Sequence, residues 1–404
     1  MSIEVKEVIE DKDSWFNIKR LKVGGLTIDR PLKTIDVRPT NSSKHILNNH
    51  LNSSYCHNEF AIFELSKNIN YEIIQNILNS RDQGYINKIF RPINYRTDKY
   101  LYIITPTFKF NPYQHSRSID DFDGFFDYYC QYSDVLFVPN LSNYRYIKEG
   151  GRWKKEEIVT LQDYLRFVDD IYNILTLKNK KSIFVPISLK FSMNEVDKII
   201  EHYIEKEYFY YWFDFEGKAV NDYTIAFIAH INRRLKENEV YDGVVSYFTN
   251  VRREIVSSPK EKEAPASDIL TVFIGANVIG CNKESPRIIE QENQTKVSQQ
   301  EMLEHKARRF VEKTYYYIKV SEDNELSLDI KERLKHKKYN TLYNTLLLNK
   351  ELDNLTKYFL SRRELKNILK NKRMLTEYKD GKLLDSLFTA KQELSNAKLT
   401  DFLY

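Results

Sequence analysis

Eight short apolar segments, separated by amphipathic stretches, are the feature that most limits how this chain can fold. The segments are rich in Ile, Val, Phe and Tyr, as buried parallel strands are. Strands that alternate with helices form βαβ units, and the strands of such units run parallel. The eight segments are Leu32–Val37, Phe60–Leu65, Tyr100–Thr105, Asp134–Pro139, Ser182–Ile187, Tyr208–Phe215, Gly243–Phe248 and Ala276–Cys281.

The stretches between these segments carry helix signals. Apolar residues recur at helical spacing from residue 161 to 175. Ser192, followed three residues later by Glu195, predicts a capping box at the start of the next helix. Ser267 is expected to cap a short helix that Gly275 ends.

The number of strands favours closure into a (β/α)8 barrel. The competing architecture is an open doubly wound sheet, which usually has a glycine-rich first turn. The sequence contains neither GxGxxG nor GxxxxGK followed by Ser or Thr. We therefore expect an α/β protein in which residues 1–290 form a (β/α)8 barrel with an N-terminal hairpin. Residues 301–404 have an amphipathic helical pattern and should form an appended basic α-helical C-terminal region.

The formal net charge of +5 is unevenly distributed along the chain. Residues 331–380 hold fourteen Lys or Arg and six Asp or Glu, so the rest of the chain is slightly acidic. This excess predicts contact with a polyanion, DNA or RNA, although a solvated helical surface explains it equally well. The candidate nucleic-acid-binding residues are Lys335, Lys337, Lys338, Arg362, Arg363, Lys372 and Arg373.

The sequence lacks the motifs typical of secretion, membrane insertion and metal binding, and their absence predicts the compartment and the use of cofactors. It begins without a secretory-signal pattern and has no apolar stretch of the roughly 18 residues that a membrane span needs. Its three cysteines, Cys56, Cys130 and Cys281, are far apart, and an odd number argues against a disulfide framework. We expect a cytoplasmic protein without a membrane partner. The histidines form no HxH or HExxH motif, so we expect no catalytic metal and no cofactor.

Two carboxylates, Asp214 and Glu216, end the sixth segment and are the candidate catalytic residues. Side chains two apart on a strand point to the same side, so both should face the carboxyl-terminal mouth of the barrel, where active sites lie. They could act as acid and base or hold a divalent ion; a solvated or salt-bridged pair is the alternative. Arg252, after the seventh segment, could bind a phosphate or carboxylate, or balance nearby acids.

Two polar insertions, residues 45–57 and 141–160, follow strands and should lie at the same mouth. The second combines aromatic side chains, among them Tyr144 and Trp153, with basic ones. This mixture suits base stacking and phosphate contact. A lid loop without a ligand is the alternative interpretation.

Leu21–Leu32, with its Gly24-Gly25 turn, Ser133–Phe137 and Ala266–Gly280 form a pattern that resembles a known family. They are similar to the opening hairpin, one inner strand, and the last helix and strand of the tRNA-guanine transglycosylase superfamily. That family includes relatives that insert 7-deazaguanine bases into DNA. The resemblance implies a barrel that exchanges a guanine for a 7-deazaguanine in DNA or tRNA.

The chain departs from the family at positions that carry the family's chemistry. The resemblance places a nucleophilic Asp at Gly280, where glycine removes the carboxylate and should leave space. The base-reading Asp and Gln correspond to Asn140 and Ser188, and the zinc cysteines are absent. Asn250 and Asn277, near the last two strands, complete the candidate substrate-binding residues.

Two hypotheses about function therefore stay open. In the first, the chain is an enzyme whose chemistry has moved to Asp214 and Glu216. In the second, it is a catalytically degenerate barrel that binds nucleic acid or a partner enzyme, or pairs with a second copy of itself. A barrel hydrolase of another kind is a third interpretation that no motif supports or removes; the sequence has no GxSxG.

Overall fold

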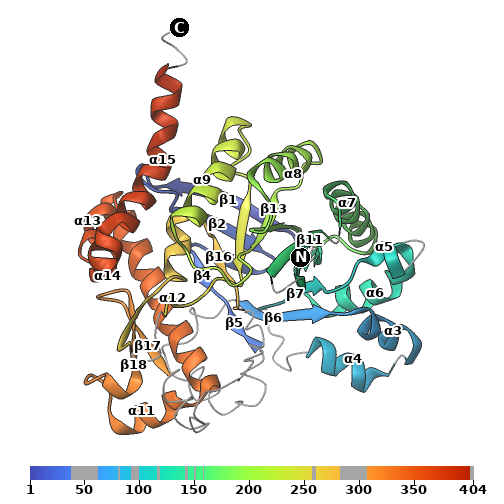
Figure 1. The fold of residues 1–404 in the computed structure, drawn as a ribbon, viewed down its shortest axis with the longest axis horizontal. Coiled ribbons are helices and arrows are strands. Elements are labelled where there is room, and N and C mark those ends of the chain that lie inside the picture. The colour runs from blue at the N-terminus through green and yellow to red at the C-terminus, as the bar shows by residue number, and fades with distance from the viewer. Residues whose placement is uncertain are drawn as a thin grey trace.

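The computed structural model describes residues 1–37, 62–80, 82–91, 100–115, 119–141, 144–149, 152–157, 159–256, 261–282 and 307–400. Parallel strands lie at the centre of an α/β fold, and helices pack around them (Figure 1). The predicted insertion at residues 45–57 lies outside the described residues.

Two parallel sheets form the centre of the molecule. Their strands are β4 (Leu32–Lys33), β5 (Ile35–Asp36), β6 (Ile62–Ile69), β7 (Leu101–Phe108), β8 (Leu136–Phe137), β9 (Asn140–Leu141), β12 (Ile183–Ser188), β13 (Tyr210–Asp214), β14 (Val245–Thr249) and β16 (Val278–Ile279). One sheet has the order β4-β16-β14-β13-β12-β8 and the other β5-β6-β7-β9. Thr34 alone separates β4 from β5, and residues 138–139 separate β8 from β9, so the chain links the sheets at both edges. All eight predicted segments contain strands, and the α/β architecture with a barrel-like parallel sheet is confirmed.

Helices cover the outer side of the strands. They are α3 (Tyr71–Ser80), α4 (Gln83–Phe90), α5 (Pro112–His115), η1 (Ile119–Phe122), α6 (Asp123–Tyr132), α7 (Leu161–Lys178), α8 (Met193–Glu205), α9 (Asp222–Glu237) and η2 (Ile269–Ile274). The Ser192 side chain accepts a hydrogen bond from the backbone N–H of Glu195, whose carboxylate accepts one from the N–H of Ser192. The predicted capping box of α8 is therefore confirmed.

The short helix η2 is capped by a different residue from the one predicted. The Asp268 side chain accepts a hydrogen bond from the Ile269 N–H at 3.1 Å. Ser267 Oγ instead accepts one from the Val220 N–H at 2.6 Å, so the hydroxyl anchors the loop before α9. Gly275 ends the helix with φ at 107°, in the left-handed region that favours glycine, as expected.

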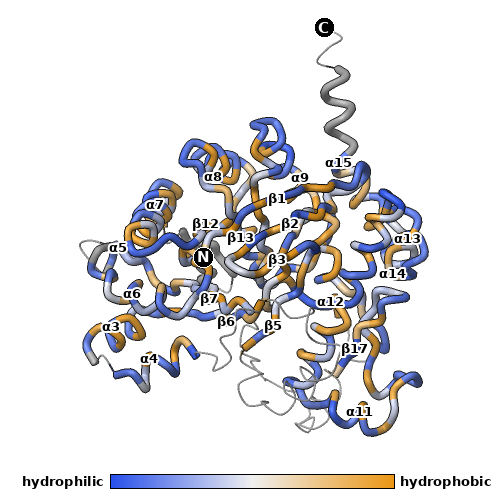
Figure 2. The backbone as a smooth tube through the Cα atoms, turned by 180° about the vertical axis from the view of Figure 1, so that it is seen from behind, coloured by the Kyte–Doolittle hydropathy of each residue, from blue (hydrophilic) through white to orange (hydrophobic). Residues whose placement is uncertain are grey.

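One hydrophobic cluster joins buried side chains of both parallel sheets to those of an antiparallel N-terminal sheet. That sheet consists of β1 (Ile3–Glu10), β2 (Asn17–Val23) and β3 (Leu26–Ile28), with the predicted turn at Gly24 (Figure 2). The Ile3 N–H donates to Ser182 Oγ, just before β12 begins, so the sheet covers the amino ends of the strands. The N-terminal sheet therefore closes the amino ends of the strands to a ligand.

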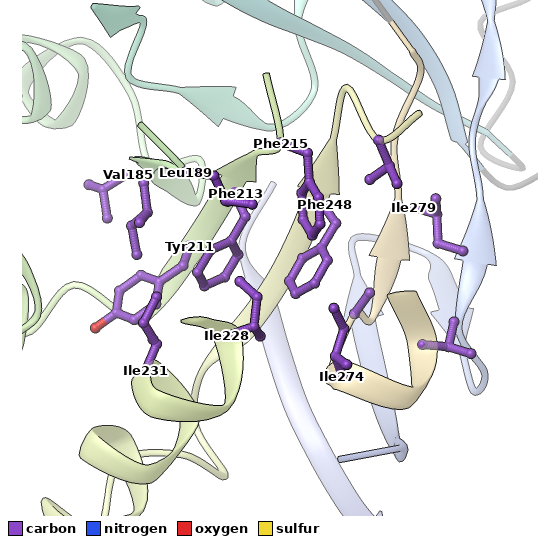
Figure 3. Close-up of a cluster of buried hydrophobic side chains, with 14 of the residues drawn as sticks. Val185, Leu189, Tyr211, Phe213, Phe215, Ile228, Ile231, Phe248, Ile274 and Ile279 are labelled. Carbon is purple, nitrogen blue, oxygen red and sulfur yellow. The ribbon is translucent and has the colours of Figure 1, made fainter. Parts of the chain in front are cut away.

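A second hydrophobic cluster joins the strands to the surrounding helices. Phe213 of β13 and Phe248 of β14 are in contact, with ring centroids 4.8 Å apart. Ile228 of α9 and Ile274 of η2 lie below these rings and are fully buried (Figure 3). This packing fixes the strands whose carboxyl ends carry the predicted site.

The C-terminal region is not wholly helical, in contrast to the prediction. β17 (Arg308–Val311) and β18 (Tyr316–Lys319) extend β15 (Glu263–Pro265) into an antiparallel sheet. Phe, Val, Ile and Tyr in these strands favour extended backbone. The helical elements are η3 (Val320–Glu322), α11 (Leu328–Lys335), α12 (Lys337–Arg362), α13 (Lys366–Lys370), α14 (Arg373–Glu377), η4 (Tyr378–Gly381) and α15 (Lys382–Thr400). No helix in the described ranges is long and apolar enough to span a bilayer.

The C-terminal helices contact β4, the first parallel strand, and the N-terminal region. Asn349 of α12 lies beside β4, where its Oδ1 accepts from the Lys33 N–H at 2.8 Å and its Nδ2 donates to the Lys33 carbonyl at 2.9 Å. The Asn349 side chain thus makes the two backbone hydrogen bonds with Lys33 that a neighbouring strand would otherwise make. Lys391 of α15 donates to the Ser14 carbonyl at 3.0 Å. The C-terminal region is thus hydrogen-bonded to both the start and the first parallel strand of the fold.

Lys19 of β2 is buried beneath the N-terminal sheet. It is 4% exposed, and its amine donates hydrogen bonds to the carbonyls of Tyr241, at 2.7 Å, and Val244. Burial lowers the pKa of Lys19 to about 7, against the opposing effect of Asp242 and Glu10. The amine can therefore lose its proton near neutral pH.

We expect Lys19 to make the free energy of unfolding depend on pH. Below pH 7 the amine is charged in both the folded and the unfolded chain, so it does not make the free energy of unfolding depend on pH. Between its folded pKa of about 7 and its ordinary value of 10.5, only the unfolded chain holds the proton. The free energy of unfolding should then rise with pH, by on the order of 1 kcal/mol per pH unit. Urea unfolding between pH 6 and 9 should show this rise in wild type and not in Lys19→Met; parallel profiles would contradict it.

Candidate active site

Polar side chains from several strands gather where the parallel strands end. Asp214 and Ser188 end β13 and β12, Asn140 begins β9, and Asn250 directly follows β14. All four are buried. Glu216 lies two residues beyond β13 and contacts Asn140 and Ser188. The structure thus brings together five residues that the sequence places on four different segments.

Three N–H groups of neighbouring site residues donate to the Asp214 carboxylate. Its Oδ1 accepts from Asn250 Nδ2 at 3.0 Å and from the Glu216 backbone N–H at 2.9 Å. Its Oδ2 accepts from Asn140 Nδ2 at 3.3 Å. These bonds fix the orientation of a nearly inaccessible carboxylate. Asp214 therefore holds in place the turn that carries Glu216.

The Glu216 carboxylate is the more accessible of the two. Its side chain is 15% exposed, whereas the whole of Asp214 is 1% exposed. Oε1 accepts from Ser188 Oγ at 3.2 Å, and Oε2 forms an ion pair with Lys190 Nζ at 3.0 Å. Lys190 also donates its backbone N–H to Ser188 Oγ. Glu216 is thus oriented by the loop after β12 while it stays open to solvent.

Two residues in this group have unusual backbone conformations. Glu216 has φ at 54° and Asn250 has φ at 56°, in the left-handed region that residues other than glycine rarely adopt. The Gly217 N–H donates to the Asn250 carbonyl at 2.9 Å, so the pairing of β13 with β14 continues into both turns. Such conformations cluster at functional sites, where surrounding structure maintains them.

The Asn140 side chain carries a buried acceptor without a donor. Its nitrogen lies between the two carboxylates, 3.3 Å from Asp214 Oδ2 and 3.5 Å from Glu216 Oε1. Among the described residues, its Oδ1 accepts no hydrogen bond, although the residue is fully buried. An unpaired buried polar atom costs about 1–3 kcal/mol. Only an N–H or O–H donor that reached this buried oxygen would remove that cost.

A second polar cluster, built around the single carboxylate of Glu64 in β6, was missed from the sequence. Glu64 is completely buried, and its carboxylate accepts from Thr34 Oγ1 at 2.8 Å, Thr105 Oγ1 at 2.9 Å, the Tyr247 hydroxyl at 2.7 Å and the Cys281 N–H at 2.6 Å. Burial first, and the Glu64 carboxylate second, raise the pKa of Tyr247 and of Cys281. Alternate polar residues within three apolar segments were the signal that could have revealed this cluster.

Gly280 does not leave the open space expected of a glycine at this position. A Cβ atom there would lie 2.7 Å from Tyr247 Cε1, 2.8 Å from Thr249 Cγ2 and 2.9 Å from Glu64 Oε2. The Glu64 carboxylate and its neighbours fill the region into which a side chain at position 280 would point. Gly280 nevertheless lies at the carboxyl end of β16, as expected.

Asn277 and Arg253 lie away from these carboxylates. Asn277 precedes β16, and its side chain accepts from the Ser246 N–H and donates to Asn17 at the N-terminal sheet. This position corrects its expected role in substrate binding. Arg253 stacks on the ring of Tyr317 in β18, 4.8 Å from its centroid. Arg252, by contrast, is exposed beside the turn that holds Glu216.

The aromatic-basic insertion forms an antiparallel hairpin in its described part. The hairpin consists of β10 (Tyr144–Glu149) and β11 (Arg152–Glu157), and it follows β9. Tyr144 pairs with Glu157, and Trp153 pairs with Lys148 across the strands. The side chains of Tyr144 and Trp153 lie outside the described part of the structure, so their predicted contact with a base stays a prediction.

The predicted nucleic-acid-binding residues do not form one surface. Lys335, Lys337 and Lys338 lie around the start of α12, and Arg362 and Arg363 at its other end. A helix of 26 residues is about 39 Å long, which separates the two groups.

Lys372 must be removed from that group because it is 7% exposed and pairs with Glu351 at 2.8 Å. An ammonium group that is enclosed in the protein cannot also neutralise a phosphate. Arg373 forms ion pairs with Glu263 and Glu377.

Metal ligands and known relatives give no further guide to the chemistry. Within the described ranges, no three His, Cys, Asp or Glu side chains are placed to hold a metal ion. Neither a scan against protein-family models nor a search of curated proteins found a match to this chain.

Proposed function

We propose that the chain is a transglycosylase-like enzyme that exchanges a guanine for a 7-deazaguanine in DNA or tRNA. The observation that carries this proposal is the accessible Glu216 carboxylate, fixed by Ser188 and Lys190, beside the buried acceptor of Asn140. The group lies at the carboxyl ends of parallel strands, where α/β barrels place their active sites. The sequence resemblance supports the choice of a base as substrate.

In the proposed reaction Glu216 is the nucleophile. One of its oxygens attacks the sugar carbon that bears the base, a C–O bond forms, and the C–N bond breaks with its electron pair leaving on the base. The departing base takes up a proton, and the incoming base gives one up as its nitrogen attacks the same carbon. That second attack releases the Glu216 carboxylate. Asp214 is a positioning residue, because it holds the Glu216 backbone N–H at 2.9 Å.

We further propose that the two parallel sheets form one closed (β/α)8 barrel. Two short connections support closure. Thr34 links β4 of one sheet to β5 of the other, and residues 138–139 link β8 to β9 at the other edge. Residues 1–290 would then form the barrel with its N-terminal sheet, and residues 301–404 a C-terminal unit docked against it. The basic residues at the start of α12 would contact the nucleic-acid backbone.

The alternative is a catalytically degenerate barrel that binds nucleic acid or a partner enzyme. The crowded position of Gly280 favours it, because no carboxylate can stand there without displacing Tyr247, Thr249 or Glu64. In this reading Glu216 and Lys190 form a structural ion pair, and the site binds a base without cleaving its bond.

Base exchange on defined nucleic acids separates the two functions. The protein should release guanine from a DNA duplex, a single strand or a tRNA, and incorporate an added 7-deazaguanine, as mass spectrometry of digested nucleosides would show. A denaturing gel should trap a covalent protein–nucleic-acid adduct. Binding without released base or adduct on any of these substrates would refute the enzyme and leave the binding function.

A further inference from the structure

Three basic side chains surround the turn that carries Glu216. Lys190 follows β12, Lys218 follows β13, and Arg252 follows β14, so the three come from consecutive loops at the carboxyl ends of neighbouring strands. Only Arg252 was selected from the sequence as a candidate binding residue. Lys190 and Lys218 are partly exposed and Arg252 is exposed.

Hydrogen bonds tie these loops together. Lys218 Nζ donates to the Leu189 carbonyl at 2.7 Å, which joins the loop after β13 to the loop after β12. The Arg252 N–H donates to the Lys218 carbonyl at 2.9 Å, and Arg252 Nε donates to the Gly217 carbonyl at 3.1 Å. The three cationic groups therefore belong to one connected rim beside Glu216.

Neither carboxylate of the site balances the charge of Arg252. Glu216 pairs with Lys190, and Asp214 is enclosed by amide and backbone donors. Among the described residues Arg252 forms no ion pair, and its guanidinium is bonded through Nε to a carbonyl. Arg253, the next residue, pairs instead with Glu254 and faces away. Arg252 thus presents positive charge to solvent, beside a site that holds two carboxylates.

We propose that Lys218 and Arg252 bind a phosphate group of the nucleotide whose base enters the site, while Lys190 orients Glu216. The identity of the phosphate as part of a nucleotide rests on the proposed function. Arginine forms paired, charge-assisted hydrogen bonds with phosphate oxygens, and lysine adds a mobile charge. A phosphate held at this rim would place the neighbouring sugar over Glu216, which positions the substrate for attack.

Binding measurements on folded full-length variants test this phosphate site. Arg252→Gln should weaken the binding of a short single-stranded DNA about tenfold, as expected for the loss of a charge-assisted hydrogen bond. It should also lower the slope of log K against log salt by about 0.7. Lys218→Gln should act in the same direction. Arg20→Gln is the matched control and should change neither quantity. Arg20 is an exposed arginine in β2, and the sheet that contains β2 covers the amino ends of the strands.

Competition identifies the source of the phosphate. Inorganic phosphate should displace the oligonucleotide from wild type more effectively than from Arg252→Gln. Guanosine monophosphate competing as strongly as the oligonucleotide would reassign the rim to a free nucleotide and overturn its place in nucleic-acid binding. Equal affinities and salt slopes for Arg252→Gln and Arg20→Gln would overturn the phosphate site itself.

The outcome for this site is separable from that of the proposed enzyme. If Arg252→Gln loses affinity but wild type exchanges no base, the phosphate site is supported and the enzyme function fails. If wild type exchanges base while Arg252→Gln binds and reacts normally, the enzyme function is supported and the phosphate site fails. Arg252→Gln should keep the urea unfolding midpoint of wild type, since Arg252 is exposed.

Discussion

Replacing Glu216 by Gln should lower the rate of base exchange by roughly 10²–10⁴-fold or more, the loss expected when a nucleophile or general base is removed. Glutamine keeps the size of the side chain and can still contact Ser188, but its amide cannot displace a base. The rate of guanine release under single-turnover conditions is the measurement, because it excludes slow product release. The covalent adduct should disappear with the activity.

The control for this variant is Glu207→Gln. Glu207 is also a glutamate with positive φ, at 56°, but it is exposed and precedes β13 at the opposite end from Glu216. Its replacement should leave the rate unchanged. Asp214→Asn should reduce the rate and also destabilise the turn, since an amide cannot accept from all three donors that surround the carboxylate. Near-normal exchange by Glu216→Gln would remove Glu216 from the mechanism.

Replacing Lys372 by Met should lower the free energy of unfolding by about 3–5 kcal/mol, because it leaves a buried carboxylate without its cation. Lys372 Nζ lies 2.8 Å from Glu351 Oε1, and the Glu351 side chain is 3% exposed. The Tyr315 hydroxyl donates to the same oxygen at 2.8 Å but carries no charge. Urea unfolding at neutral pH measures the loss.

The double variant Lys372→Met with Glu351→Leu tests the cause of that loss. Removing both charges should restore much of the stability, since an apolar pair of similar volume replaces a buried ion pair at little cost. Binding of nucleic acid by the double variant should equal that of wild type, because Lys372 is enclosed. A single variant as stable as wild type would show that Glu351 finds another partner or becomes protonated.

The sequence predicted the strands well because their signal is local. Each of the eight apolar segments carries its own composition, and each contains a strand. The capping box at Ser192 was likewise readable, since both partners lie within three residues. The cap of η2 was assigned to Ser267 because the pattern cannot tell which of two adjacent capping residues is engaged by a distant segment, here Val220.

The site was predicted only in part because its contacts are non-local. Asp214 and Glu216 were found from their spacing, but Lys190 joins Glu216 from another loop, and nothing in its local sequence marks it. Lys372 and Arg373 have similar sequence surroundings to the exposed Arg362 and Arg363. Lys372 is nevertheless buried, and it pairs with Glu351, which lies 21 residues earlier. A run of charged residues in the sequence shows only the local composition. Whether each residue is buried depends on which distant partner it meets in the fold.

The contact between Asn349 and Lys33 has a consequence for synthesis of the chain. Strand β4 leaves the ribosome long before α12, since the side chain that completes the hydrogen bonds of Lys33 follows 316 residues later. At typical rates of 5–20 residues per second, that interval is roughly 15–60 s. During this time the first parallel strand has no partner on that side, so a nascent chain would need a chaperone or fast later folding to keep the strand from pairing with another molecule.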